Sequence, residues 1–227
     1  MKPLIIALDV DTEKEALGLL RRTKNHCDIY KVGPTLVLRY GPAILKKIRA
    51  SGKKIFLDLK FHDIPNTMER AVKEAAGTGV FSLTVHTSAG EAALKAVASV
   101  KKRPQIWGVT VLTSLSQVDL DQIGFNRSPM DQASRLAELA KRSEIDGIVA
   151  SVGETAALRQ LLGPKFTIVT PGIRMPDGAA GDQKRVATPG HARFAGASFI
   201  VVGRPIIEAR DPDELAAAVL ADWKKGV

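Results

Sequence analysis

Residues 54–67 read KIFLDLKFHDIPNT, an apolar run that becomes charged just before a Pro-Asn turn. Side chains of a β-strand alternate between its two faces. One face is apolar and is expected to pack against helices: Ile55, Leu57, Leu59 and Phe61. The opposite face carries Phe56, Asp58 and Lys60, and Asp63 lies just beyond in the loop. The stretch therefore predicts a strand whose charged end opens onto a functional site.

Short apolar runs recur along the whole chain at fairly even spacing. They predict eight strands: Leu4–Leu8, Asp28–Val32, Lys54–Lys60, Phe81–His86, Gln105–Leu112, Gly147–Ala150, Phe166–Thr170 and Phe199–Val202. Helical patterns lie between most of them: Thr12–Arg22, Asn66–Gly77, Gly90–Val100, Met130–Arg142, Glu154–Leu162 and Asp213–Lys225. In the first of these, Thr12 is a plausible N-cap with Glu15 three residues later.

Alternating strands and helices predict right-handed βαβ units and a parallel sheet. Eight such units in 227 residues predict an α/β protein with a (β/α)8 TIM barrel, as a single domain over residues 1–227. A doubly wound open sheet is the alternative. No G-x-G-x-x-G follows the first strand, and this favours the barrel.

The composition narrows the classes of partner. The net charge is +9, which favours an anionic partner such as nucleic acid, anionic lipid or a phosphorylated small molecule. Basic pairs are scattered and aromatic residues make up only 5%, so a phosphorylated substrate is favoured over nucleic acid. No uncharged apolar run approaches membrane-spanning length, and we expect no membrane partner.

A single cysteine, Cys27, leaves no intramolecular disulfide and no multi-cysteine metal site. This composition fits a reducing compartment. The N-terminal residues 1–9 are too short in their apolar part for a signal peptide. We therefore expect a cytoplasmic protein.

Two further predicted strands end in charged residues, Asp9 and Lys31. In a barrel the carboxyl ends of the strands gather around one point, so these two residues should meet Asp58, Lys60 and Asp63 in a cluster of alternating charge. An ion-pair network that only ties strands together is the structural alternative. Buried charges are costly unless they are paired, and several of them at one mouth point to chemistry.

The last two strands end in TPGIR (170–174) and VVGRP (201–205). A helix start combined with an arginine makes an anion site, and barrel enzymes often bind phosphate after these strands. Gly203 would let the backbone approach a ligand closely. A plain turn is the alternative for the Gly-Arg-Pro sequence. Two loops, Thr113–Pro129 and Pro171–Gly190, are expected at the same face.

The segment DLKFHDIPNT (58–67) resembles the signature of the orotidine 5′-monophosphate decarboxylases. The resemblance covers nearly the whole chain and includes ALD at 7–9, KVG at 31–33, LTS at 112–114, TPGIR at 170–174, GDQKR at 181–185 and VVGRP at 201–205. It implies decarboxylation of orotidine 5′-monophosphate to UMP, the last step of de novo pyrimidine synthesis. Because the sequence shows no CxxC or HExxH pattern and no thiamine or pyridoxal signature, we expect the reaction to use no cofactor and no metal.

The same resemblance implies a role for each matching residue. The charged array would consist of the catalytic Lys60 with Lys31, Asp58 and Asp63. Asp63 and Thr67 would come from the second subunit of a homodimer. The remaining substrate contacts would be Asp9 and Lys31 to the ribose, Thr113 or Ser114 near the pyrimidine, and Arg174, Gln183, Gly203 and Arg204 around the phosphate. The sequence does not choose between Thr113 and Ser114, although Thr113 matches the family pattern better.

Two other functions compete with this hypothesis. One is a magnesium-dependent keto-sugar-phosphate decarboxylase or aldolase on the same barrel, and the other is a basic nucleic-acid-binding protein. The DIPNT turn (63–67) and the segment 181–185 argue against both. His62 and His86 lie near strand ends, but two histidines without an obvious third ligand are weak evidence for a metal site.

Overall fold

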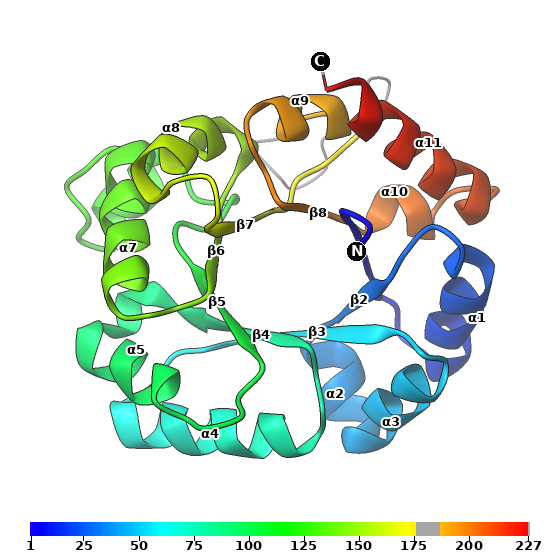
Figure 1. Cartoon of the computed structure of the whole chain (residues 1–227), viewed down its shortest axis with the longest axis horizontal. Helices are drawn as coiled ribbons and strands as arrows, with labels where there is room; N and C mark the ends of the chain where they lie inside the picture. Colours follow the sequence, from blue (N-terminus) through cyan, green and yellow to red (C-terminus); the bar gives the residue numbers. More distant parts are fainter. Residues whose placement is uncertain (176–186, 227) are drawn as a thin grey trace.

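The computed structural model describes residues 1–175 and 187–226. In this part of the chain, eight parallel strands close into a barrel in sequence order (Figure 1). The strands are β1 (Leu4–Ala7), β2 (Ile29–Val32), β3 (Lys54–Phe61), β4 (Ser82–His86), β5 (Gln105–Val109), β6 (Gly147–Val149), β7 (Thr167–Thr170) and β8 (Phe199–Val202). Strand β8 pairs with β1 and completes the ring. The predicted TIM barrel is confirmed.

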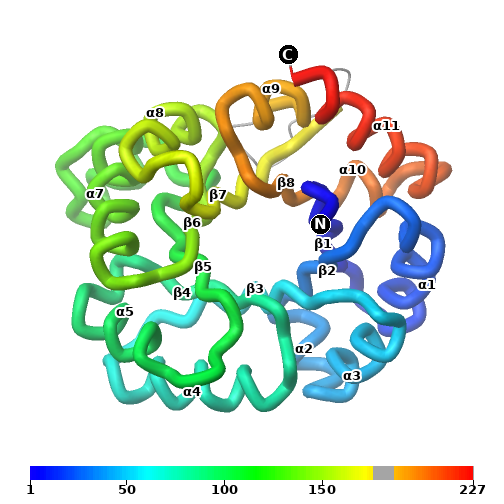
Figure 2. The backbone as a smooth tube through the Cα atoms, in the orientation of Figure 1, coloured from blue at the N-terminus to red at the C-terminus, as the bar shows by residue number. Residues whose placement is uncertain are grey.

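Helices surround the barrel as an outer ring, which the backbone trace in Figure 2 shows clearly. They are α1 (Glu13–Thr23), α2 (Pro34–Tyr40), α3 (Pro42–Ala50), α4 (Pro65–Gly77), α5 (Glu91–Ala98), α6 (Gln117–Gln122), α7 (Pro129–Arg142), α8 (Val152–Leu162), α9 (Pro189–Phe194), α10 (Arg204–Ile207) and α11 (Pro212–Lys225), with a 3₁₀ turn η1 (Thr87–Ala89). The predicted cap of α1 is confirmed, because Thr12 and Glu15 form a reciprocal capping box. Among the described residues, no helix is long and apolar enough to cross a membrane.

Several short helices escaped prediction. Helices α2 and α3 fill the connection between β2 and β3, where Gly41 separates them in a left-handed conformation with φ of 57°. A helix of seven or nine residues shows too few turns for a periodic apolar pattern to stand out. The expected loop Thr113–Pro129 contains α6, which begins with a capping box between Ser116 and Asp119.

Strand β5 ends at Val109, three residues before the predicted end at Leu112. A turn follows within the predicted end of the strand, where the backbone N–H of Leu115 donates to the carbonyl of Leu112. The apolar residues after Val109 thus belong to a loop at the mouth of the barrel. The expected loop Pro171–Gly190 is also shorter than predicted, since α9 begins at Pro189.

The core has an inner and an outer layer. The inner layer fills the barrel and comprises Ile5, Ala7, Ile29, Phe56, Trp107, Val169 and Val201. The outer layer lies between strands and helices and includes Ile55 and Leu57 of β3. The predicted alternation of β3 is therefore confirmed for Phe56, whose ring packs edge-on against Trp107 with 4.6 Å between centroids. This packed interior is the floor on which the cavity rests.

Candidate active site

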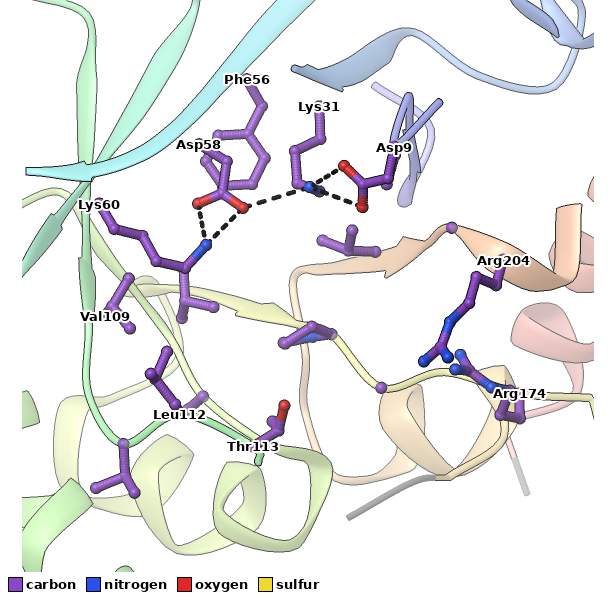
Figure 3. Close-up of a pocket in the computed structure, with 18 residues that line it drawn as sticks. Asp9, Lys31, Phe56, Asp58, Lys60, Val109, Leu112, Thr113, Arg174 and Arg204 are labelled. Carbon is purple, nitrogen blue, oxygen red and sulfur yellow. Dashed lines mark hydrogen bonds and ion pairs between the residues drawn. The ribbon is translucent and has the colours of Figure 1, made fainter. Parts of the chain in front are cut away.

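A cavity of about 300 Å³ opens at the carboxyl ends of the strands (Figure 3). Three inner-layer residues, Ala7, Phe56 and Val201, form part of its floor. Charged side chains from β2, β3 and the segment just after β1 lie at one end, and two arginines that follow β7 and β8 lie at the other (Figure 3). The cavity therefore presents two chemically different ends to one ligand.

Four charged residues form a row of alternating sign along one wall. The ammonium Nζ of Lys31 lies 2.8 Å from Oδ1 of Asp9 and 3.4 Å from Oδ2 of Asp58. The ammonium Nζ of Lys60 lies 2.8 Å from Oδ1 and 2.9 Å from Oδ2 of the same Asp58. Asp58 thus forms ion pairs with both lysines and accepts hydrogen bonds from Lys60, as the dashed lines in Figure 3 show. The row places a paired but still accessible lysine at the cavity.

Mutual pairing keeps the two most buried members of the row ionised. Burial disfavours the charged form of Asp58, but Lys31 and Lys60 outweigh it and lower the pKa of this carboxyl. Burial likewise disfavours charged Lys31, but Asp58 and Asp9 outweigh it and raise the pKa of this lysine. Both groups therefore carry their charges at neutral pH.

Lys60 occupies an unusual backbone conformation at the end of β3. Its φ is 48°, in the left-handed region that non-glycine residues seldom adopt. The pairing of β3 with β4 also changes register between Leu57 and Phe61, which is the mark of a bulge. Bulges next to active sites often redirect a side chain. Here the irregularity sets the direction of the lysine that faces the cavity.

Arg174 and Arg204 lie at the opposite end of the cavity from Lys60 (Figure 3). Arg174 follows β7 and is only 8% exposed, whereas Arg204 begins α10 directly after β8. A Cβ atom at Gly203 would approach the Cβ of Ala7 to 3.3 Å. Glycine at this position therefore keeps the backbone close to the cavity without a side chain. Two guanidinium groups beside it suit an oxyanion such as phosphate.

The structure brings most of the predicted site residues to this cavity. Those that line it are Asp9, Lys31, Asp58, Lys60, Thr113, Arg174, Gly203 and Arg204. Thr113 lines the cavity and Ser114 does not. Asp63 and Thr67 are exposed and do not line the cavity of their own chain. Gln183 lies outside the described residues.

Sequence reasoning missed the apolar wall between the two ends. Val109, Val111 and Leu112 line the cavity together with Pro171 and Gly172. A signal was present, because Val109 and Val111 share the alternation that places Trp107 in the barrel. Such a wall suits the flat, weakly polar face of a ring, and it would exclude water from the lysine beside it.

The histidine pair lies beside the charged row. The rings of His62 and His86 lie 5.3 Å apart between centroids. Within the described part of the chain, no group of three or more His, Cys, Asp or Glu residues could hold a metal ion. The pair therefore gives no support to a metal centre.

Comparisons with known proteins identify a family. The model of the orotidine 5′-phosphate decarboxylase / HUMPS family matches residues 2–219. A protein named orotidine 5′-phosphate decarboxylase from Alcanivorax borkumensis is 44% identical over 96% of this chain and 96% of its own length. One of the same name from Nitrosococcus oceani is 46% identical, again covering 96% of both chains.

The fold is shared as well. The crystal structure of orotidine 5′-phosphate decarboxylase from Lactobacillus acidophilus superposes with a TM-score of 0.85 and 36% identity, covering 98% of this chain and 99% of that chain. The chain therefore belongs to the orotidine 5′-phosphate decarboxylase / HUMPS family.

Proposed function

We propose that this chain decarboxylates orotidine 5′-monophosphate to UMP, the last step of de novo pyrimidine synthesis, and does so without a cofactor. The observation that carries the proposal is the cavity with a lysine–aspartate row at one end and two arginines at the other. The chain is a carboxy-lyase by its family, and relatives at 44% identity bear the name of this enzyme.

The two ends of the cavity suit the two ends of the nucleotide. In this proposal, Arg174 and Arg204 bind the phosphate together with backbone groups at Gly203, where α10 begins. Gln183, which lies outside the described residues, is proposed as a further phosphate ligand. Asp9 and Lys31 bind the ribose hydroxyls. The pyrimidine then lies against the apolar wall, with Thr113 at its edge.

The chemical step leaves an electron pair at C6 of the pyrimidine. The bond between C6 and the carboxylate breaks, CO₂ departs as a neutral molecule, and the negative charge moves to C6. We assign Lys60 two tasks, which are to stabilise this charge with its ammonium and then to donate a proton from Nζ to C6. The resulting amine regains its proton from water. A charge fixed before the reaction needs no reorganisation during it.

The neighbours of Lys60 hold this ammonium in place. Asp58 contacts it through both carboxylate oxygens, and Lys31 in turn contacts Asp58. Repulsion between Asp58 and the substrate carboxylate would raise the energy of the bound substrate. We rank this contribution second to stabilisation of the carbanion, because ground-state effects of this kind are contested.

The proposed enzyme is a cytoplasmic homodimer that shares residues across its interface. Asp63 and Thr67 do not line their own cavity, and both are exposed at the start of α4. The neighbouring Ile64 is 66% exposed, and the proposed contact would cover this apolar side chain. In the dimer, Asp63 and Thr67 of each copy complete the site of the other copy.

Loss of the ultraviolet absorbance of orotidine 5′-monophosphate tests the proposal directly. The purified protein is incubated with this nucleotide in the presence of EDTA, and UMP is identified as the product. Conversion that is insensitive to EDTA supports the proposal. No conversion by folded protein, together with activity on a keto-sugar phosphate when magnesium is restored, would favour the metal-dependent alternative.

A further inference from the structure

Thr84 lies in β4 behind the charged row and is only 1% exposed. Its hydroxyl oxygen Oγ1 accepts a hydrogen bond from the backbone N–H of Lys60, with 2.9 Å between the heavy atoms. The same hydroxyl donates to Oδ1 of Asp58, also at 2.9 Å. The residues that line the cavity do not include Thr84. It therefore reaches the cavity only through Lys60 and Asp58.

The directions of these two hydrogen bonds follow from the groups involved. An ionised carboxylate only accepts, a backbone N–H only donates, and a threonine hydroxyl has one proton to give. The hydroxyl must therefore donate to Asp58 and accept from Lys60. Since Asp58 also accepts from Nζ of Lys60, the bonds close a ring that holds the lysine at its backbone and at its ammonium.

The backbone of Lys60 needs such an anchor. Leu57 pairs with Leu83, and the next registered pair is Phe61 with Val85, so the four steps along β3 match only two along β4. Lys60 lies in this bulge with a φ of 48°. A left-handed conformation of this kind persists only where surrounding contacts enforce it. The hydroxyl of Thr84 supplies the contact by binding the amide of Lys60 inside the bulge.

We propose that Thr84 is a positioning residue for the decarboxylation, whose single hydroxyl fixes the Lys60 backbone and the Asp58 carboxylate together and so aims the ammonium into the cavity. The inference rests on the proposed function. It assigns Thr84 no contact with substrate. The residue acts on the step that uses the ammonium, whereas the ribose and phosphate ligands at Asp9, Lys31 and Arg204 keep their own contacts.

The test compares kcat and KM for orotidine 5′-monophosphate among four proteins. Thr84→Val keeps the side-chain shape but removes the hydroxyl, and we expect kcat to fall about 100-fold because small misplacements of reacting groups are this costly. KM should stay within about threefold, since binding contacts survive. Thr84→Ser keeps the hydroxyl and should recover most of the lost kcat.

Thr23→Val is the matched control. Thr23 is also fully buried and its hydroxyl also makes two contacts, with the carbonyl of Leu19 and the hydroxyl of Tyr30. Thr23 lies in α1 outside the site, so loss of its hydroxyl should leave kcat unchanged.

The pH dependence of kcat provides a second measurement on Thr84→Val. Because the hydroxyl helps to lower the pKa of Asp58, the acid limb of kcat should move to higher pH in Thr84→Val.

Three kinetic results would overturn the inference. These are a kcat of Thr84→Val within about threefold of the wild type, a Thr84→Ser variant as impaired as Thr84→Val, or an equal loss in Thr23→Val. Amide hydrogen exchange on the wild type does not depend on folding of any variant. Rapid exchange of the Lys60 amide would contradict the inference by itself. Wild-type turnover in the same series reports separately on the proposed function.

Discussion

The ammonium Nζ of Lys60 donates to both carboxylate oxygens of Asp58, at 2.8 Å from one oxygen and 2.9 Å from the other. The Asp58 side chain is 11% exposed and that of Lys60 is 37% exposed. The pair is therefore anchored on its carboxylate side and open on its ammonium side. This asymmetry is what a proton donor to a bound substrate requires, because the charge is held in place and yet can be reached.

In Asp58→Asn, the free energy of unfolding should fall less steeply as the pH is lowered than in the wild type. The folded-state pKa of Asp58 lies below its ordinary value of 3.8, because Lys31 and Lys60 outweigh the burial of the carboxyl. Its contribution to the free energy of unfolding is therefore present above that value and is lost as pH falls through the lower folded pKa. Denaturant unfolding between about pH 5 and pH 2 should show a shallower fall for the variant than for the wild type.

Asp121→Asn provides the control for this measurement. Asp121 is an exposed residue of α6, and its substitution removes the same formal charge from the surface. The stability of this variant should follow the wild-type pH dependence. An acid dependence of Asp58→Asn that equals that of the wild type would show that Asp58 is not held ionised by the two lysines.

Arg204→Ala should lower turnover of the nucleotide orotidine 5′-monophosphate far more than turnover of the nucleoside orotidine. A hydrogen bond to a charged group contributes about 1.5–3 kcal/mol, so kcat/KM for orotidine 5′-monophosphate should fall roughly 10- to 150-fold. Orotidine lacks the phosphate, and its slow turnover should change little. Arg210→Ala, a nearby exposed arginine that does not line the cavity, should affect neither substrate. Equal losses on both substrates would contradict a phosphate site at Arg204.

Mixing two inactive variants should restore activity if the site is shared between subunits. In a dimer of one Lys60→Ala chain and one Asp63→Ala chain, one of the two sites has an intact lysine and an intact aspartate from the other copy. Random exchange at equal amounts should recover about a quarter of wild-type activity, because half the dimers are mixed and half their sites are intact. Turnover is measured after subunit exchange has been verified.

The control mixture combines Lys60→Ala with Asp58→Ala. Both residues belong to the same wall of one chain, so every site in a mixed dimer carries a lesion. No activity should return. Recovery in this control, or no recovery with Asp63→Ala after proven exchange, would argue against the shared site.

The sequence predicted the elements whose patterns are local and repeated. The alternation of Phe56 with Ile55 and Leu57 identified the inward face of β3, and the charged end of that face identified the mouth of the barrel. Arg174 and Arg204 could be placed in one site because the strands that precede them are neighbours in a closed barrel. In the second case the order of strands converts sequence position into spatial position.

The parts that escaped prediction depend on contacts between strands. The left-handed backbone of Lys60 arises from a register change against β4, and no local pattern in β3 encodes it. Thr84 appears in the sequence as an ordinary polar residue of a strand, and only the structure shows it bound to Lys60 and Asp58. The short helices α2 and α3 were missed for a different reason, because about two turns carry too little periodicity.

Replacement of Lys60 tests the central claim most directly. Lys60→Ala should lower kcat for orotidine 5′-monophosphate by at least about 1,000-fold, because the preorganised charge and the proton donor are both lost. Thermal unfolding and UMP binding should show that the fold and the cavity survive. Lys54→Ala, at the other end of the same strand, should retain wild-type turnover. Turnover by Lys60→Ala near the wild-type rate would contradict the account.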